Sequence, residues 1–205
     1  MRFSNLIRTA LLLLALTALP GCAALRSATT SLDTYELTPL PQSSSPVRRG
    51  GRHLLVELPT ATAAIASDNI VIKPNPLQVQ SLPGVRWVDV ATDHVRLLLV
   101  RSLANTGRFG LVTGPEPGPL PDIVLLTDLD AFQAETSTGE DKSVKVLIGM
   151  TLTLVRDTGT VIATRRFDRV STAASGSNVD ILNAFNLTMT GLLGEAVPWV
   201  VSQAR

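Results

Sequence analysis

The chain has 205 residues, which favours one domain or two small ones, and 45% of its residues are hydrophobic while only 4% are aromatic. Its 18 Lys and Arg nearly balance 17 Asp and Glu, so the formal net charge is +1 and the sequence lacks the broadly basic surface of a dedicated nucleic-acid-binding protein. One Cys and two His are too few for a Cys/His zinc site, and a single Cys excludes a disulfide within the chain. We therefore expect no nucleic-acid partner, no metal and no other cofactor.

The N-terminus has the residue order of a secretory signal peptide. Arg2 and Arg8 precede an apolar run over residues 10–19, which is shorter than the about 20 residues needed to cross a membrane. Cys22, the only Cys of the chain, ends a Leu-Pro-Gly-Cys sequence that resembles a bacterial lipobox. We predict that residues 1–21 are a cleaved signal peptide and that Cys22 is lipidated; the alternative is an ordinary thiol.

Lipidation would anchor the mature protein on a membrane without spanning it, because each buried methylene of an acyl chain contributes about 0.8 kcal/mol. Residues 22–32 predict a tether, and residues 33–205 predict one domain with a loop rich in Ser, Pro, Gly and Arg at residues 42–52. Ala23 stands where an Asp commonly retains lipoproteins at the inner membrane of enteric bacteria. By that resemblance, we expect the anchor in the periplasmic face of the outer membrane of a Gram-negative bacterium.

Four short segments in the first half of the domain predict strands. Three of them are β-prone runs that a proline follows, namely Thr34–Thr38, His53–Leu58 and Ile70–Ile72. In the fourth, Leu77–Leu82, apolar and polar residues alternate, which predicts a half-buried strand that ends in a turn at Pro83-Gly84.

A helix is predicted next, with Thr92 or Asp93 as its N-cap and Gly107 as its C-terminal stop. Apolar residues recur in it at steps of three and four, at Val95, Leu98, Leu99 and Leu103.

Three longer β-type runs, Ile123–Glu135, Val144–Arg156 and Thr160–Val170, predict an antiparallel meander. In the second run one face consists of Val146, Ile148, Met150, Leu152 and Leu154. In the third run one face consists of Val161, Ala163, Arg165 and Phe167, and Arg165 interrupts its apolar character.

A second helix is predicted to open at a capping box, Ser177-x-x-Asp180, and to end or bend at Pro198. Its predicted buried stripe is Ile181, Leu182, Phe185, Met189, Leu192, Leu193 and Ala196. Two helices and six or seven strands predict an α+β fold, a two-layer sandwich in which two main helices cover one face of a largely antiparallel sheet.

The sequence contains no nucleophile elbow, Walker-type loop, HExxH or GxGxxG motif, and this favours a non-enzyme. Asp128 and Asp130 are two residues apart on a predicted strand, so they face the same side, as a general acid and a general base do. The alternative is a solvent-exposed face of the sheet. His94 lies within a predicted helix, where an exposed or core-edge His is the more common explanation. We assign no catalytic residue.

The segment Ile70–Asp89 combines restricted backbone with unusual side chains. Pro74 and Pro76 restrict the chain and Asn75 permits a turn. Arg86, Trp87 and Asp89 offer a planar donor, a flat ring and an acceptor, which are groups that anchor protein interfaces. We take these six residues as candidate partner contacts. The alternative is that Trp87 belongs to the core and Arg86 pairs locally with Asp89.

Over nearly the whole mature chain, the sequence resembles the ABC-type transport auxiliary lipoproteins, in particular the PqiC-like ones. The resemblance rests on the lipobox, the strand Thr34–Leu37, the Ile70–Asp89 segment and the helix that continues through Arg101–Phe109. Ser81 departs from the aromatic residue that often precedes Leu-Pro-Gly in this family, and Lys73 departs from the common Arg.

This resemblance implies a non-catalytic auxiliary component of a system that moves lipid between membranes. Its implied partners are an MCE-domain protein, an ABC permease and its ATPase, with a homo-oligomeric ring as a further possibility. The alternative is an independent periplasmic lipid-binding lipoprotein with a groove between helices and sheet, whose apolar walls would be Leu98, Leu99, Phe185 and Met189.

Overall fold

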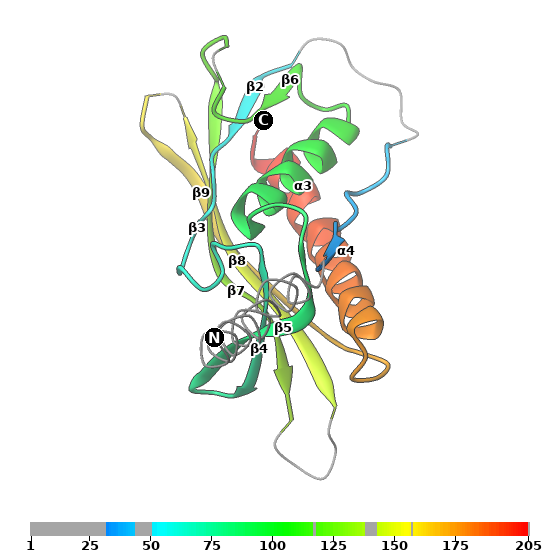
Figure 1. Ribbon diagram of the computed structural model, residues 1–205. Coiled ribbons are helices and arrows are strands. Elements are labelled where there is room, and N and C mark those ends of the chain that lie inside the picture. Colours follow the sequence, from blue (N-terminus) through cyan, green and yellow to red (C-terminus); the bar gives the residue numbers. More distant parts are fainter. Residues whose placement is uncertain (1–31, 44–50, 117, 138–142, 157, 205) are drawn as a thin grey trace, which may run out of the picture. The chain divides into compact units, whose positions relative to one another are not determined.

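The computed structural model describes residues 32–43, 51–116, 118–137, 143–156 and 158–204. The chain divides after Leu32, and the second unit is Asp33–Arg205. The described part of the second unit contains a nine-stranded sheet and two helices (Figure 1). Cys22, the signal peptide and nearly all of the tether lie outside the described residues and stay predictions.

The predicted meander is confirmed. Strands β7 (Ile123–Thr136), β8 (Val144–Arg156) and β9 (Val161–Thr172) pair in antiparallel order. The five β8 residues predicted to share a face are all fully buried, whereas only Phe167 is buried among the four of β9. Strand β9 pairs only with β8 in the described sheet and forms its edge, so the inward-facing pattern is weaker there.

The other side of β7 is shared by three short strands that run parallel to it. They are β2 (His53–Val56), β3 (Thr60–Ala61) and β4 (Asn69–Asn75). Strand β6 (Leu111–Thr113) extends the sheet beside β2, while β5 (Gln78–Trp87) and then β1 (Asp33–Tyr35) extend it beside β4. The sheet is therefore mixed, with its longest pairs antiparallel.

The predicted turn at Pro83-Gly84 is wrong, because both residues lie inside β5. The register jumps there from the Ser81–Val71 pair to the Arg86–Asn69 pair, and Gly84 has a φ of 79°, which an L side chain rarely adopts. The strand is bulged rather than ended.

The predicted half-buried face of the β5 segment is also wrong in its first part. Leu77 and Val79 are exposed, and burial begins at Leu82 and continues at Val85 and Trp87. The reason is that the tip of the β4–β5 hairpin extends beyond the region that the helices cover (Figure 1).

Helix α3 (Ala91–Asn105) buries the four apolar residues predicted for it. Its N-cap is Val90, which makes no side-chain cap hydrogen bond, so the predicted cap at Thr92 or Asp93 is wrong. The predicted stop is confirmed: Gly107 has a φ of 63° and donates its N–H to the Ala104 carbonyl.

Helix α4 (Asn178–Gln203) is capped as predicted, since Ser177 Oγ accepts the Asp180 N–H at 3.2 Å. All seven residues of the predicted stripe are buried. The helix does not end at Pro198 but continues to Gln203.

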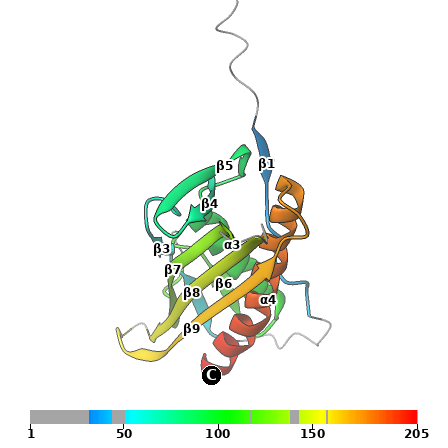
Figure 2. The same ribbon diagram turned by 90° about the horizontal axis from the view of Figure 1, so that it is seen from below.

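Both helices lie on the same face of the sheet (Figures 1 and 2), which confirms the α+β sandwich. Leu98, Leu99, Phe185 and Met189 are at most 1% exposed and belong to the core cluster. They are therefore core residues and not the walls of an open lipid groove.

Within the described residues, neither helix is both long enough and apolar enough to cross a membrane.

Candidate functional site

The six candidate contact residues lie at the two ends of one hairpin. Pro74 and Asn75 end β4, and Pro76 begins the turn into β5. Arg86 and Trp87 end β5, and Asp89 follows. The structure therefore does not gather the six side chains into one patch.

Trp87 is a core residue with 1% of its surface exposed. Its ring lies 5.6 Å from His94 of α3, 5.4 Å from Phe132 of β7 and 5.3 Å from Phe185 of α4, measured between centroids. Because the indole connects the sheet to both helices, it presents no surface to a partner. The interpretation of Trp87 as an exposed contact is corrected in favour of the core alternative.

Arg86 forms an ion pair, but with Asp68 at 3.4 Å and not with Asp89. The backbone supports this pair, since the Trp87 N–H donates to the Asp68 carbonyl at 2.8 Å. About half of each charged side chain is exposed, so the pair contributes little to stability. Arg86 and Asp89 stay predicted contacts.

The turn between β4 and β5 presents an apolar side chain to solvent. We call residues Asn75–Gln78 the hairpin tip. Asn75 Oδ1 accepts the Leu77 N–H at 3.1 Å, and Asn75 Nδ2 donates to Gln78 Oε1 at 2.9 Å. With Pro76 inside the turn, these bonds hold the backbone in place while Leu77 is 96% exposed. Sequence reasoning missed Leu77 because it assigned this residue to a half-buried strand, although the adjacent Asn75-Pro76 turn pointed to a loop position.

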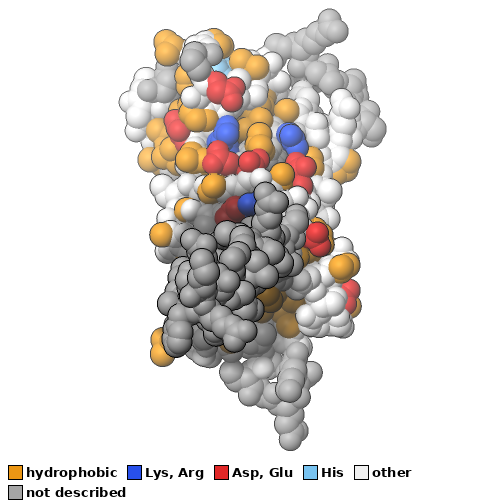
Figure 3. Space-filling view, viewed as in Figure 1, with side chains coloured by type: hydrophobic (Ala, Val, Ile, Leu, Met, Phe, Trp, Pro, Cys, Tyr) orange, Lys and Arg blue, Asp and Glu red, His pale blue; other side chains and the backbone are white. Residues whose placement is uncertain are grey.

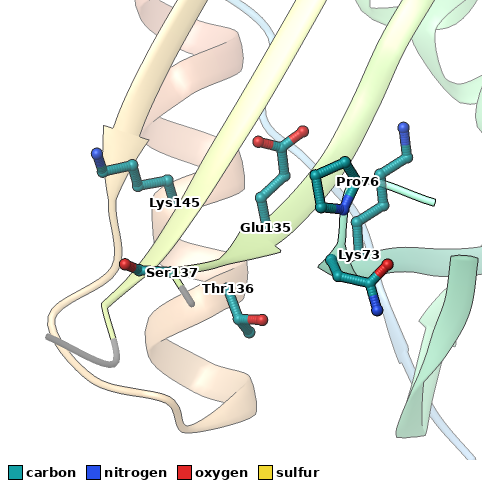
Figure 4. Close-up of a pocket in the computed structure, with 7 residues that line it drawn as sticks. Lys73, Pro76, Glu135, Thr136, Ser137 and Lys145 are labelled. Carbon is teal, nitrogen blue, oxygen red and sulfur yellow. The ribbon is translucent and has the colours of Figure 1, made fainter. Parts of the chain in front are cut away.

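An open pocket of about 400 Å³ adjoins the hairpin tip (Figure 4). Its lining consists of Lys73, Asn75, Pro76, Glu135, Thr136, Ser137 and Lys145. The sheet register places Lys73 of β4 beside Glu135 of β7, and Glu135 beside Lys145 of β8. Glu135 accordingly stands between the two lysines, as Figure 4 shows.

The two strand carboxylates considered for catalysis are held separately. Asp128 accepts a hydrogen bond from Thr60 Oγ1 at 3.0 Å, and Asp130 forms an ion pair with Arg166. Asp130 lies at a register shift between Leu129 and Ala131, where the strand is bulged. Each carboxylate therefore has a donor of its own, and among the described residues neither forms a hydrogen bond or ion pair with a histidine.

Both histidines have structural roles. His94 is 2% exposed, and its Nε2 accepts the Leu37 N–H at 2.9 Å, which requires the neutral ring. Burial lowers the pKa of His94 from the usual 6.5, although the Glu36 and Asp89 carboxylates act to raise it. His53 contacts the Leu120 carbonyl and Thr113 Oγ1.

Within the part of the chain that the structure describes, no group of three or more His, Cys, Asp or Glu side chains could hold a metal ion. On the face of the molecule seen in Figure 3, acidic and basic side chains lie next to one another. Two of the ion pairs involve α3, namely Arg96 with Asp93 and Arg101 with Glu36.

Comparison with known proteins identifies the family. The fold is that of protein XCC0632 from Xanthomonas campestris, with a TM-score of 0.73 and 23% sequence identity over 83% of this chain and 95% of that one. A second solved structure, of an uncharacterized protein, matches with a TM-score of 0.64 and 15% identity over 83% of this chain and 99% of that one. No curated protein matches the sequence at a significant level. The profile of the family described as "ABC-type transport auxiliary lipoprotein component" matches residues 35–196, and the chain therefore belongs to this family of lipoproteins that assist ABC-type transport.

Proposed function

We propose that this protein is a non-catalytic, lipid-anchored component of an ABC/MCE-type system that moves lipid between membranes, and that it docks the periplasmic end of the lipid conduit at the outer membrane. The observation that carries the proposal is membership in the auxiliary lipoprotein family over residues 35–196. The lipobox-like sequence at Cys22 supports the anchor. The separate anchoring of Asp128 and Asp130 supports a non-catalytic role.

Among the described residues, the hairpin tip is the part of the surface best suited to contact the conduit. Leu77 is almost fully exposed on a turn that its own hydrogen bonds hold rigid. A rigid apolar projection loses little conformational entropy when a partner covers it, so most of the free energy of burial stabilises the complex. Pro74, Asn75 and Pro76 act by fixing this turn, while Arg86 and Asp89 lie at the other end of the hairpin.

Crosslinking in the native cells tests the proposal. The full-length protein with a C-terminal tag is crosslinked, purified and analysed by mass spectrometry, with Cys22→Ser as the non-lipidated control. We expect an MCE-domain protein, together with the permease and ATPase, to be captured by the lipidated form. If the protein comes away alone with bound phospholipid, the independent lipid-binding lipoprotein is the better description.

A matched pair of variants tests the contact surface. Leu77→Asp places a charge on the hairpin tip, and Leu120→Asp places the same charge on another exposed leucine, which is 91% exposed and precedes the opposite end of β7. We expect Leu77→Asp to reduce the crosslinked yield about fivefold or more, because burying an unpaired charge is unfavourable, and Leu120→Asp to leave it unchanged. Equal yields from both variants would remove the hairpin tip from the interface.

A homo-oligomeric ring is part of the same proposal. Native mass spectrometry of the detergent-solubilised lipoprotein measures the number of copies directly. A strictly monomeric spectrum at concentrations that support docking would contradict the ring while leaving the docking role intact.

A further inference from the structure

We propose that the pocket beside the hairpin tip binds a phosphate ester that carries an amine, such as a phosphoethanolamine group. The pocket's seven lining residues come from the ends of β4, β7 and β8 and from the segments that follow β4 and β7. This inference goes beyond the docking role. It can hold whether or not the protein docks a partner.

The distribution of lysine is the first observation. The chain contains only three lysines, Lys73, Lys142 and Lys145, while all its other basic side chains apart from histidine are arginines. Two of the three line this one pocket. A lysine ammonium is a compact charge with three donors, and it binds phosphate as a point charge.

These two lysines have no acidic partner in the described chain. Every ion pair among the described residues uses an arginine. Lys73 and Lys145 each flank Glu135 in register on the neighbouring strands, yet neither ammonium comes within ion-pair distance of that carboxylate. Their donors are therefore available to a ligand.

Glu135 is held in position by a buried neighbour. Gln133 is 6% exposed, and its Nε2 donates to Glu135 Oε1 at 2.7 Å. This bond occupies one carboxylate oxygen and leaves the other to accept a hydrogen bond from a ligand. Because Gln133 is anchored in the sheet, the carboxylate stays between the two lysines instead of turning towards either one.

The pocket also offers hydroxyl groups. Thr136 Oγ1 donates to the Pro74 carbonyl at 3.1 Å, so the lone pairs of its oxygen remain free to accept a hydrogen bond. Ser137 adds a second hydroxyl at the same end of β7, where its N–H is already bonded to the Ser143 carbonyl at 3.0 Å.

The order of the charges selects the class of ligand. Across three adjacent strands the row reads positive, negative, positive, with a net positive charge. A simple anion is attracted by the two lysines but repelled by Glu135. A simple cation is attracted by Glu135 but repelled by the lysines. A group with a phosphate and an ammonium a few bonds apart is attracted by both signs. A volume of about 400 Å³ is near the lower end of the range for ligand pockets, which suits a small polar group.

Two sources supply this chemistry, a soluble phosphomonoester and the phosphodiester headgroup of a membrane lipid. The experiment separates them with small probes. The full-length lipidated protein in dodecyl maltoside is reductively methylated on its lysines with ¹³C-formaldehyde and a borane reductant, which keeps the charge, and the few resulting signals are assigned with Lys73→Arg and Lys145→Arg. Titrations use O-phosphoethanolamine, ethyl phosphate and glycerophosphoethanolamine.

We expect O-phosphoethanolamine to shift the signals of Lys73 and Lys145 and to bind about fivefold more tightly than ethyl phosphate, which has the same carbon skeleton without the amine. A factor of about five is the upper end of the effect of one solvent-exposed ion pair, here the one with Glu135. Glu135→Gln should remove this preference by weakening O-phosphoethanolamine and strengthening ethyl phosphate. Lys73→Gln should weaken the binding of both ligands, as read from the Lys145 signal, and Lys145→Gln should do the same, as read from the Lys73 signal.

Arg101→Gln is the matched control, since it removes an exposed positive charge from α3. It should leave all affinities unchanged. Glycerophosphoethanolamine binding at least as tightly as the monoester would assign the site to a lipid headgroup, and weaker binding would assign it to a soluble ester. Absence of shifts at millimolar ligand, equal affinity for ethyl phosphate in the wild type, or an equal loss in Arg101→Gln would overturn the proposal.

Discussion

At the residue scale, Trp87 joins the three parts of the core. Its ring contacts rings of α3, β7 and α4, and it is among the largest side chains that the fold buries completely. We predict that Trp87→Ala lowers the free energy of unfolding by about 3–5 kcal/mol, because it removes the buried surface and leaves a cavity. Urea unfolding followed by circular dichroism measures the change. Trp199→Ala is the control: this ring is only partly buried, against Phe167 at 5.5 Å, so a smaller loss is expected. A loss below about 1 kcal/mol for Trp87→Ala would contradict this role.

His94 makes the stability depend on pH. Its neutral Nε2 accepts the Leu37 N–H, and burial lowers its pKa below 6.5. In the unfolded chain the ring takes up a proton near pH 6.5, while in the folded chain it resists protonation until a lower pH. The unfolded state thus binds more protons in this window, and the stability that the neutral ring contributes is present above pH 6.5 and is lost as the pH falls towards the folded-state pKa.

Urea unfolding between pH 8 and pH 5 tests this sign. We expect the free energy of unfolding of the wild type to fall more steeply with decreasing pH than that of His94→Gln, which has an acceptor oxygen but does not titrate. Parallel curves would show that His94 has the same pKa in the folded and unfolded chains.

At the element scale, α4 contains two glycines with different surroundings. A Cβ added at Gly194 would meet no atom within 4 Å, whereas one at Gly191 would lie 2.7 Å from Arg169 Cζ. The Arg169 side chain passes over Gly191 and donates to Glu195 Oε1 at 2.8 Å. The helix therefore tolerates a side chain freely at one position and only with movement of Arg169 at the other.

We predict that Gly194→Ala raises the free energy of unfolding by about 0.5–1 kcal/mol, because alanine loses less conformational entropy in a helix. Gly191→Ala should give a smaller gain or none, since the same benefit is offset by displacing Arg169 from Glu195. Thermal unfolding of the two variants side by side measures this difference. Equal gains would mean that the Arg169–Glu195 pair and its packing contribute nothing.

At the scale of the whole molecule, the segment that follows β1 forms hydrogen bonds with both helices. We call residues Glu36–Ser43 the strap. Four of its backbone N–H groups bond to the helices: Leu37 to His94, Thr38 to Asn186, Leu40 to Ser102 and Ser43 to the Asn105 carbonyl. The strap follows directly on β1, so these bonds hold the start of the described domain against both helices.

We predict that Asn186→Ala speeds hydrogen exchange of the Thr38 amide about tenfold while leaving the Leu37 amide protected. Thr38 is exposed and depends on Asn186 Oδ1 for its N–H at 2.9 Å, whereas Leu37 is buried and bonded to His94. Amide exchange followed by NMR distinguishes the two sites. Faster exchange at both amides would show that the strap opens as a unit.

Local patterns predicted most of the elements correctly. The meander, the body and stop of α3, and the cap and buried stripe of α4 follow from periodicity and from capping chemistry, which involve residues close together in the chain. The prediction of the α3 N-cap was wrong because Thr92 and Asp93 already lie inside the helix. The helix begins at Ala91 without any side-chain cap. The prediction of a turn at Pro83-Gly84 was wrong because a bulge in a paired strand favours the same residue types as a turn.

The sequence by itself determined the family, the fold class and the identity of the candidate anchor, Cys22. Only the tertiary structure decided that Trp87 is buried, that Leu77 is exposed, and that Lys73, Glu135 and Lys145 line one pocket. The physical reason is that burial and strand register depend on which distant segments pair. Here β4 and β8 both add to β7, one parallel and one antiparallel, and no pattern within either segment specifies that its lysine will flank the same glutamate.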